Sequence, residues 1–444
     1  MQRRYRDSNE MRPYEVPLTG LPNPSGGARH WYVPASDRTV HWGYFSKSLA
    51  PIIEIDSGDY VTLECLTHQA GDDPARLLRG DAGAESVYHW TAQRKNVDRR
   101  GAGPMDAANG AGGGQGVHIL TGPVCVRGAR PGDLLEVRII DMYPRPCANP
   151  AYADRVFGTN LAANWGYHYL DLMEEPRPRE VVTIYEIETT SGREFARPLY
   201  NYRWGPVTDP NGVIHRVYDY PGLIADPEMQ RPQRDILRNV RVPIRPHFGT
   251  LGLAPKEADL VSSIPPNYTG GNVDDWRIGK GATIYYPVSV EGALLSAGDT
   301  HAAQGDSELC GTAIESSWTG LFQVILHARR DVPDRSLLAQ VQWPLLETRD
   351  EWVVHGFSHP NYLTDLGEHA QRDVFMKSSV DLAMRDAFRK MRGFLMHAHR
   401  MSEDEAISLM SVAVDFGITQ VVDGNWGVHA SLKKSIFTDY GASP

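Results

Sequence analysis

Apolar and polar residues alternate along several short segments of this chain, the pattern of half-buried β-strands. Val61, Leu63 and Cys65 alternate with Thr62 and Glu64 behind a Ser-Gly-Asp turn at residues 57–59. Strand-like segments return at residues 124–143, 285–295, 322–328 and 338–343. The pattern therefore predicts a mainly β protein.

The C-terminal part has a different periodicity. Apolar residues recur at helical spacing from Val380 to Leu395, which predicts a helix. Ser402 and Glu405 have the spacing of a capping box ahead of a second helix, with Gly417 as its expected C-cap. We expect an α+β arrangement at this end of the chain.

Five segments follow from these patterns. They are an irregular N-terminal arm (1–50), a first β unit (51–145) with a lid-like insertion (72–116), a Pro-rich middle region (146–246), a second β unit carrying the candidate site (247–345), and an α+β part (346–444). The insertion ends in the glycine-rich run GAGGGQG and carries Tyr88, His89 and Trp90. We expect it to close over a small substrate and so control which one is accepted. An oligomer contact is the alternative.

An internal repeat predicts duplicated β-sandwich or barrel units. Val124-x-Val126-x-Gly128-Ala129, followed by Gly132-Asp133-Leu134-Leu135, recurs as residues 288–293 followed by Gly-Asp-Thr-His at 298–301. His301 then takes the place of the core residue Leu135. An inward polar group needs a partner, and Asp299 lies two residues earlier, on the same face of a strand. We therefore expect ligand or catalytic duty for this pair, with a satisfied core histidine as the alternative.

Charge and cysteine content narrow the function classes. The formal net charge is −10 and the chain has no basic stripe, so a nucleic-acid partner is not expected. The four cysteines form no CxxC pair. The N-terminus shows no apolar signal region, and no run approaches the length of a membrane span. We expect a soluble cytoplasmic protein without a membrane partner, which disfavours a secreted carbohydrate-binding sandwich.

Reactive side chains are densest in GDTHAAQGDSELCGTAIE, residues 298–315. This run combines one histidine with several carboxylates, and Asn272 and Asp274 lie shortly before it. Such a set suits a divalent metal such as zinc. It equally suits metal-free general acid–base chemistry. A hydrogen-bonded turn network without chemistry is the third interpretation.

Several long motifs resemble the acetamidase/formamidase family. They are GGNVD, YYPVSVEGA and GDTHAAQGDSELCGTAIE in the second β unit, with LTGPVCVRGARPGDLLEV, IDSGDYVTLEC and SVAVDFGITQVVDGNWGVHA elsewhere. The resemblance implies hydrolysis of the C–N bond of short linear amides, a duplicated and mostly β fold, and a homo-oligomer. The chain departs from the family at Ser307, where glycine is usual. Residues 72–116 and 144–246 show little similarity, so the identity of the amide stays open.

Amide hydrolysis needs an activated nucleophile, a stabilised oxyanion and a proton for the departing ammonia. A metal could supply the first two, and we expect Asp299, His301 and Glu308 as its ligands. Glu315 is the expected proton shuttle, with Glu308 and His301 as further catalytic groups. The predicted substrate-binding residues are Asn272, Asp274 and His118.

Two alternatives stay open. Cys310 could act as a nucleophile through a thioester, although a cysteine of this kind is typically a small buried hydrophobe. The chain could also be a non-catalytic, metal-holding β scaffold that binds a small molecule. His68 is a further pocket candidate, because it follows the first predicted hairpin close to the insertion.

Overall fold

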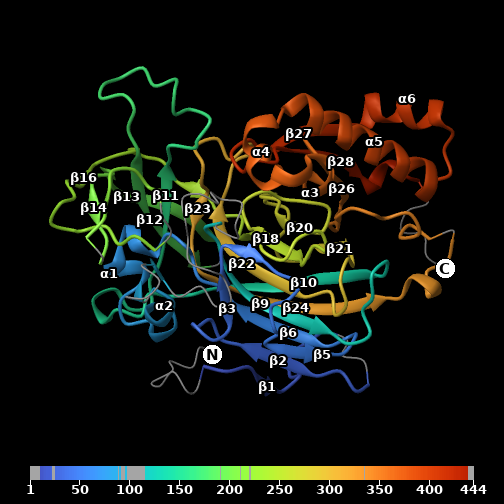
Figure 1. The fold of residues 1–444 in the computed structure, drawn as a ribbon, viewed down its shortest axis with the longest axis horizontal. Coiled ribbons are helices and arrows are strands. Elements are labelled where there is room, and N and C mark those ends of the chain that lie inside the picture. Colours follow the sequence, from blue (N-terminus) through green and yellow to red (C-terminus); the bar gives the residue numbers. More distant parts are fainter. Residues whose placement is uncertain are drawn as a thin grey trace.

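A computed structural model describes residues 11–22, 26–88, 90–91, 96–97, 116–190, 192–210, 212–219, 222–334 and 336–438. In these ranges the chain forms two large β-sheets, with the longest helices near the C-terminal end (Figure 1). The predicted mainly β fold is confirmed. None of the helices in this described part combines the length and apolar character needed to cross a bilayer.

Sheet A joins strands from both ends of the chain. In spatial order it contains β1 (Tyr14–Val16), β2 (His30–Val33), β6 (Tyr60–Glu64), β24 (Trp318–His327), β10 (Leu134–Pro144), β21 (Thr283–Pro287), β25 (Leu345–Glu347), β26 (Glu351–Phe357), β28 (Gly427–Lys433) and β27 (Val414–Gln420).

Sheet B contains the strands that carry the candidate site. Its main path is β16 (Gln233–Arg234), β13 (Arg193–Arg203), β12 (Val181–Thr190), β11 (Val156–Ala162), β23 (Ile314–Glu315), β22 (Leu295–Ala303), β18 (His247–Leu253) and β20 (Gly270–Asn272). β17 (Val242–Pro243) pairs with β13, while β9 (Ile119–Val126) pairs with β22, β3 (Val40–Trp42) and β5 (Ile53–Ile55).

Short elements complete the described fold. The two-stranded pairs are β4 (Tyr44–Phe45) with β19 (Val261–Ser262), β7 (Trp90–Thr91) with β8 (Asn96–Val97), and β14 (Val207–Thr208) with β15 (Ile214–His215). The α-helices are α1 (Pro74–Leu77), α2 (Ala82–Val87), α3 (Tyr362–Asp365), α4 (Ala370–Lys377), α5 (Val380–Ala398) and α6 (Glu403–Ala413).

The main hydrophobic core lies between the two sheets. Leu63 and Val137 of sheet A belong to the same buried cluster as Val124 and Leu251 of sheet B. The rings of Phe248 and Phe322, one from each sheet, have centroids 5.1 Å apart. Burial of apolar side chains between facing sheets is what stabilises a sandwich of this type.

The C-terminal helices cover one end of sheet A, where α5 packs on β26 and β28 (Figure 1). Both predicted helices are present, and Ser402 and Glu405 form the expected capping box. The expected C-cap is wrong: α6 ends at Ala413, and Gly417 lies inside β27. The chain turns directly from helix to strand here, because Val414 to Gln420 pair with β28.

The two copies of the repeat pair crosswise. β9 of the first copy pairs with β22 of the second, and β10 pairs with β21. The connecting turns also meet, since the Val126 amide donates to the Gly292 carbonyl and the Gly292 amide donates to the Ala129 carbonyl. The repeat suggests a Gly-Asp turn in both copies, but only the first copy turns at its Gly-Asp pair, at residues 131–132. The second copy turns at residues 291–292, and Gly298 and Asp299 lie inside β22.

The predicted segments contribute to common sheets. The arm at residues 1–50 supplies β1, β2 and β3, and the middle region at 146–246 supplies β11, β12 and β13 of sheet B. The second β unit supplies β18, β20, β22 and β23 to the same sheet. The five segment boundaries stay predictions.

Candidate active site

Strand β22 lies in sheet B between β18 and β23. His301 of β22 is directly opposite His247 of β18 and directly opposite Glu315 of β23. Residues directly opposite each other on antiparallel strands direct their side chains to the same face of the sheet. The three strands therefore place His247, His301 and Glu315 in one row.

Asp299 and His301 share one site, as predicted. Oδ1 of Asp299 lies 3.4 Å from Nε2 of His301. The repeat alignment behind the prediction was wrong, because His301 lies well inside β22 whereas Leu135 lies at the start of β10. The prediction holds because an i, i+2 pair on a strand faces one side.

Three of the candidate carboxylates have backbones in the left-handed region. The φ angles are 54° at Asp274, 52° at Asp299 and 47° at Glu308. Non-glycine residues adopt this region uncommonly, and such conformations concentrate at functional sites. Ser307, which replaces the glycine usual in the family, has a φ of 78°, so the family's glycine would be easily accommodated here.

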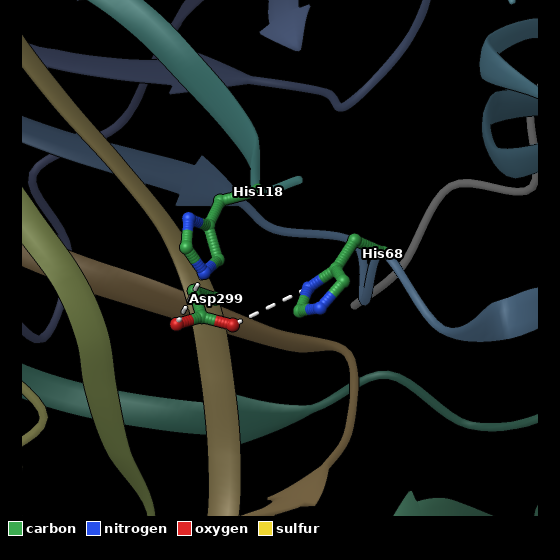
Figure 2. Close-up of side chains that lie close together, drawn as sticks. All are labelled: His68, His118 and Asp299. Carbon is green, nitrogen blue, oxygen red and sulfur yellow. Dashed lines mark ion pairs between the residues drawn. The ribbon is translucent and has the colours of Figure 1, made fainter. Parts of the chain in front are cut away.

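Two further histidines converge on Asp299, as Figure 2 shows. His68 follows β6 and places Nδ1 3.4 Å from Oδ1 of Asp299. His118 precedes β9 and places Nε2 3.6 Å from Oδ2 of the same carboxylate. Nδ1 of His118 is 2.8 Å from the Ser263 hydroxyl. Both pocket candidates among the histidines are thus brought to the site.

Among the described residues, three groups have potential ligand atoms within 4.8 Å of one another. The predicted ligand set of Asp299, His301 and Glu308 is divided between two of them. The groups are His68–His118–Asp299, Asp299–His301–Glu315 and Asp274–His301–Glu308. Cys310 belongs to none of these groups.

Asn272 and Asp274 lie beside β18. The Thr250 hydroxyl donates to Oδ1 of Asn272 at 2.6 Å and reaches Oδ2 of Asp299 at 3.3 Å. Asp274 lies against Asp423, which follows β27 and also contacts Glu308. Asn272 therefore meets the cluster through Thr250, while Asp274 is a member of it.

Burial and mutual contact set the protonation of the cluster. Burial lowers the pKa of His118 to about 4. Burial also disfavours the charged form of His301, but Glu315 and Asp299 outweigh it and raise the pKa of His301 well above its usual value. The pKa of Asp299 is held well below its usual value despite burial, because His118 and His301 surround it. Burial raises the pKa of Asp423 to about 7.

Many polar atoms of the cluster are buried without a well-formed hydrogen bond, and some face only each other, as Nδ1 of His68 faces Oδ1 of Asp299 at 3.4 Å. An unpaired buried polar atom is unfavourable, so these atoms point to a ligand. They are Nδ1 of His68, both carboxylate oxygens of Asp274, Oδ1 of Asp299, Nε2 of His301, Oε2 of Glu315 and Oδ2 of Asp423.

Gly249 of β18 keeps this space open. A Cβ added at Gly249 would lie 2.5 Å from Oδ1 of Asp274, Oδ2 of Asp299 and Cε1 of His301. Carboxylates and ring atoms this close cannot accommodate a methyl group without displacement. The glycine is therefore a requirement of the site's geometry.

The predicted lid is described only in part. Residue 89, residues 92–95 and residues 98–115 lie outside the described residues, as do the surroundings of the Trp90 side chain. Tyr88 is buried, where its hydroxyl donates to the Thr67 carbonyl and accepts from the Ala70 amide, both at 3.0 Å. The hydroxyl of Tyr88 is therefore engaged with the main chain, and the role of the insertion as a lid stays a prediction.

Sequence reasoning missed Asp423 and His247, and it assigned no role to Gln304 within the run at residues 298–315. Asp423 lies within the C-terminal motif VVDGNWGVHA that carries part of the family resemblance, so that motif was a usable signal. The pairing of β18 with β22 brings His247 to the site, and Gln304 reaches the site by the contact of its side chain with His301. Neither feature is visible in a single sequence.

Comparison with known proteins agrees with this fold. Solved acetamidases from Bacillus halodurans and Yersinia enterocolitica superpose with a TM-score of 0.58 each, at 21% identity. The first match covers 92% of this chain and 99% of the other, and the second covers 90% of both. At this identity the likeness establishes a shared fold.

Sequence comparison then gives the family. The model of the acetamidase/formamidase family matches residues 114–263 and 257–439, and the chain belongs to this family. It is 33% identical to the acetamidase of Mycolicibacterium smegmatis over 222 residues, 45% of this chain and 50% of that protein. It is 29% identical to the formamidase of Methylophilus methylotrophus over 228 residues, 45% of this chain and 49% of that protein. The chain spans about half the length of these curated relatives.

Proposed function

We propose that this protein hydrolyses the C–N bond of a short linear amide, of the size of formamide or acetamide, to ammonia and a carboxylate. The observation that carries the proposal is the buried cluster of histidines and carboxylates centred on Asp299 in a chain of this family. Its unpaired donor and acceptor atoms suit a small polar substrate.

A divalent metal such as zinc fits the residues present. His68, His118 and Asp299 would hold it, because two imidazoles and one carboxylate are a common catalytic zinc set that leaves a position open. When bound, the metal would lower the pKa of a water molecule and polarise the amide carbonyl. This assignment moves His118 from substrate binding to metal binding and leaves His301 and Glu308 for other duties.

The remaining residues bind the amide and move protons. Asp274 offers a carboxyl oxygen that accepts an N–H group of the amide. Asn272, held by Thr250, borders the same position. Glu308 lies in contact with Asp274 at this position. Burial is the main cause of the raised pKa of each of these two carboxyl groups.

His301 and Glu315 form the acid–base pair. Nε2 of His301 lies 3.3 Å from Oε1 of Glu315, and the pair accepts a proton from the attacking water. It returns the proton to the departing nitrogen, so that ammonia leaves as the C–N bond breaks. This proposal keeps for Glu315 the role of proton shuttle that we expect from the sequence.

The test is ammonia release by the purified full-length protein from a panel of short amides, run beside metal analysis. Turnover of formamide, acetamide or propionamide with about one metal per chain supports the proposal. Metal bound without ammonia release from any amide would favour the non-catalytic, metal-holding scaffold. Turnover by metal-free protein would support the amidase activity and contradict a role for the metal in the mechanism.

We also infer a homo-oligomer in the cytoplasm. The loop between β11 and β12 exposes Tyr167, Leu170 and Met173, and the last two are more than 90% exposed. Apolar residues gathered on a projecting loop are typical of an interaction surface. All four cysteines are free thiols, as in proteins of a reducing compartment. Light scattering and cell fractionation test these two inferences.

A further inference from the structure

The two ring nitrogens of His301 have different surroundings. Nε2 faces Asp299 at 3.4 Å and Glu315 at 3.3 Å. Nδ1 faces the opposite way, 3.1 Å from Nε2 of His247 and 3.1 Å from Oε1 of Gln304. A neutral imidazole carries its proton on one nitrogen only, and the hydrogen bond made by one nitrogen decides the state of the other.

Gln304 presents an acceptor to this ring. Its Nε2 donates to the main-chain carbonyl of Asp274 at 2.6 Å, which fixes the orientation of the amide. Oε1 is therefore the atom directed at His301. An amide oxygen only accepts, so Nδ1 of His301 must be the donor in this contact.

His247 presents a second acceptor. Its Nδ1 lies 2.6 Å from the Arg245 carbonyl, which only accepts, so this nitrogen carries the proton. In the neutral ring Nε2 then carries no proton, and it lies 3.1 Å from Nδ1 of His301 and 3.1 Å from Oε1 of Gln304. Two acceptors this close to each other need an N–H between them, and Nδ1 of His301 supplies it. The two imidazoles meet nearly edge to face, with centroids 4.8 Å apart and planes at 86°.

We propose that His247 and Gln304 are positioning residues that hold the proton of His301 on Nδ1, so that Nε2 is the atom exchanging protons at the reaction centre. Neither residue touches the substrate. Their effect on catalysis rests on the amide hydrolysis proposed above, whereas the tautomer of His301 is a property of the folded chain and can be measured without substrate.

The proton on Nδ1 of His301 stabilises the packing of these three side chains. Both rings are completely buried, so an Nδ1 without its proton would leave three acceptor atoms facing one another. Partners of this kind around a catalytic or ligating histidine typically change activity or affinity by about 10–100-fold when removed. His247 and Gln304 accept from the same N–H, so their losses should not be additive.

The first test is nitrogen NMR of the full chain labelled with ¹⁵N-histidine, with the His301 signals assigned by their loss in His301→Gln. In the wild type we expect Nδ1 to carry a proton at every pH where the fold persists. In the double variant His247→Leu/Gln304→Leu we expect neutral His301 to shift toward the form protonated on Nε2. An unprotonated Nδ1 in the wild type, or an unchanged tautomer in the double variant, would overturn the proposal.

The second test compares turnover with melting temperature. His247→Leu should lower kcat by about 10–100-fold and change KM by less than about twofold. His247→Gln retains an acceptor and should recover at least part of the loss. The matched control is His41→Leu, because His41 is equally buried and contacts Ser296 of the same strand at 2.9 Å.

The control is expected to keep wild-type kcat among its folded molecules. A fall in His247→Leu no larger than in His41→Leu, with no recovery in His247→Gln, would reduce His247 to a packing residue and overturn the proposal. If no variant and no wild-type sample hydrolyses any amide, the proposed function fails. The NMR result then still decides whether the tautomer is fixed as inferred.

Discussion

His301 and Glu315 are directly opposed on β22 and β23, with Nε2 of the imidazole 3.3 Å from Oε1 of the carboxylate. Both side chains are buried, and Oε1 of Glu315 also accepts from the Ala313 amide at 2.9 Å. The carboxylate is therefore held in place from its own strand while it meets the ring. The predictions below start from this pair.

Replacing His301 by Ala should lower kcat by at least about 100-fold, because the acid–base partner of Glu315 is lost. The circular dichroism spectrum should stay that of a folded β protein. Turnover close to the wild type would return His301 to the category of a buried structural histidine.

Removing His118 should empty the metal site. His118→Ala leaves one imidazole and one carboxylate in the His68–His118–Asp299 group, which is too few for a closed zinc set. We expect metal content near zero by elemental analysis, and a lower melting temperature because bound metal stabilises the folded state. Full metal occupancy in this variant would instead assign the metal to the Asp299–His301–Glu315 group.

Asp72 should make the free energy of unfolding fall as the pH rises from about 4 to about 7. Burial raises its pKa to about 7, despite the hydrogen bond from Thr159, whereas the unfolded chain has a value of about 4. From about pH 4 to pH 7 the unfolded state loses this proton while the folded state keeps it, so the free energy of unfolding declines.

Asp72→Asn mimics the protonated carboxyl and should flatten that decline. We expect the variant to melt a few degrees above the wild type at pH 7.5 and close to it at pH 4.5, measured by calorimetry. Parallel melting curves across the whole range would contradict the raised pKa.

Gly249→Ala should abolish activity, since its Cβ would collide with Asp274, Asp299 and His301 at 2.5 Å. We expect a loss of kcat of at least about 100-fold, a small mispositioning in an active site being enough for this. The control is Gly393→Ala in α5, where a Cβ meets nothing within 4 Å. It should keep full activity and gain up to about 1 kcal/mol of stability.

Cys310→Ala should retain activity. Sγ accepts from Asn160 Nδ2 at 3.2 Å and lies 3.5 Å from the Thr312 carbonyl, outside the three ligand groups. A hydrolysis run by His301 and Glu315 needs no thiol. Complete loss of ammonia release, together with a thioester trapped in the wild type, would replace the mechanism proposed here.

The sequence alone could predict the strands and the centre of the site. Alternation predicted β6, β10 and β24, and the i, i+2 spacing joined Asp299 to His301, because both inferences depend only on neighbours along the chain. The crosswise pairing of the two repeat copies could not be predicted. It is decided by which strands are neighbours in sheet B for β9 and β22 and in sheet A for β10 and β21, and the sequence of either copy is compatible with other pairings.

Which residues of the site contact one another was harder to predict, because this too depends on neighbours that are distant in the sequence. Glu308 was expected beside Asp299, but the turn at Ser307 and Glu308 directs it to Asp274 and Asp423. Elements of the Pro-rich middle region could not be assigned from the sequence, yet β12 and β13 pair there over almost their full lengths. Pro198 lies inside β13, beside the register shift between Ile184 and Tyr185 of β12, and a proline tolerated at such an irregularity hides the strand from pattern reading.

The crosswise union of β9 with β22 and β10 with β21 has a consequence for how the protein is made. The groups around Asp299 begin with His68 near the N-terminus and end with Asp423 near the C-terminus, so a chain still being synthesised holds no complete site. Long-range strand pairing of this kind also folds slowly. The proposed metal ligands His68, His118 and Asp299 can meet once β22 has paired with β9. Asp423 joins them only after β27 has emerged from the ribosome, so the cluster is completed last at its carboxylate side.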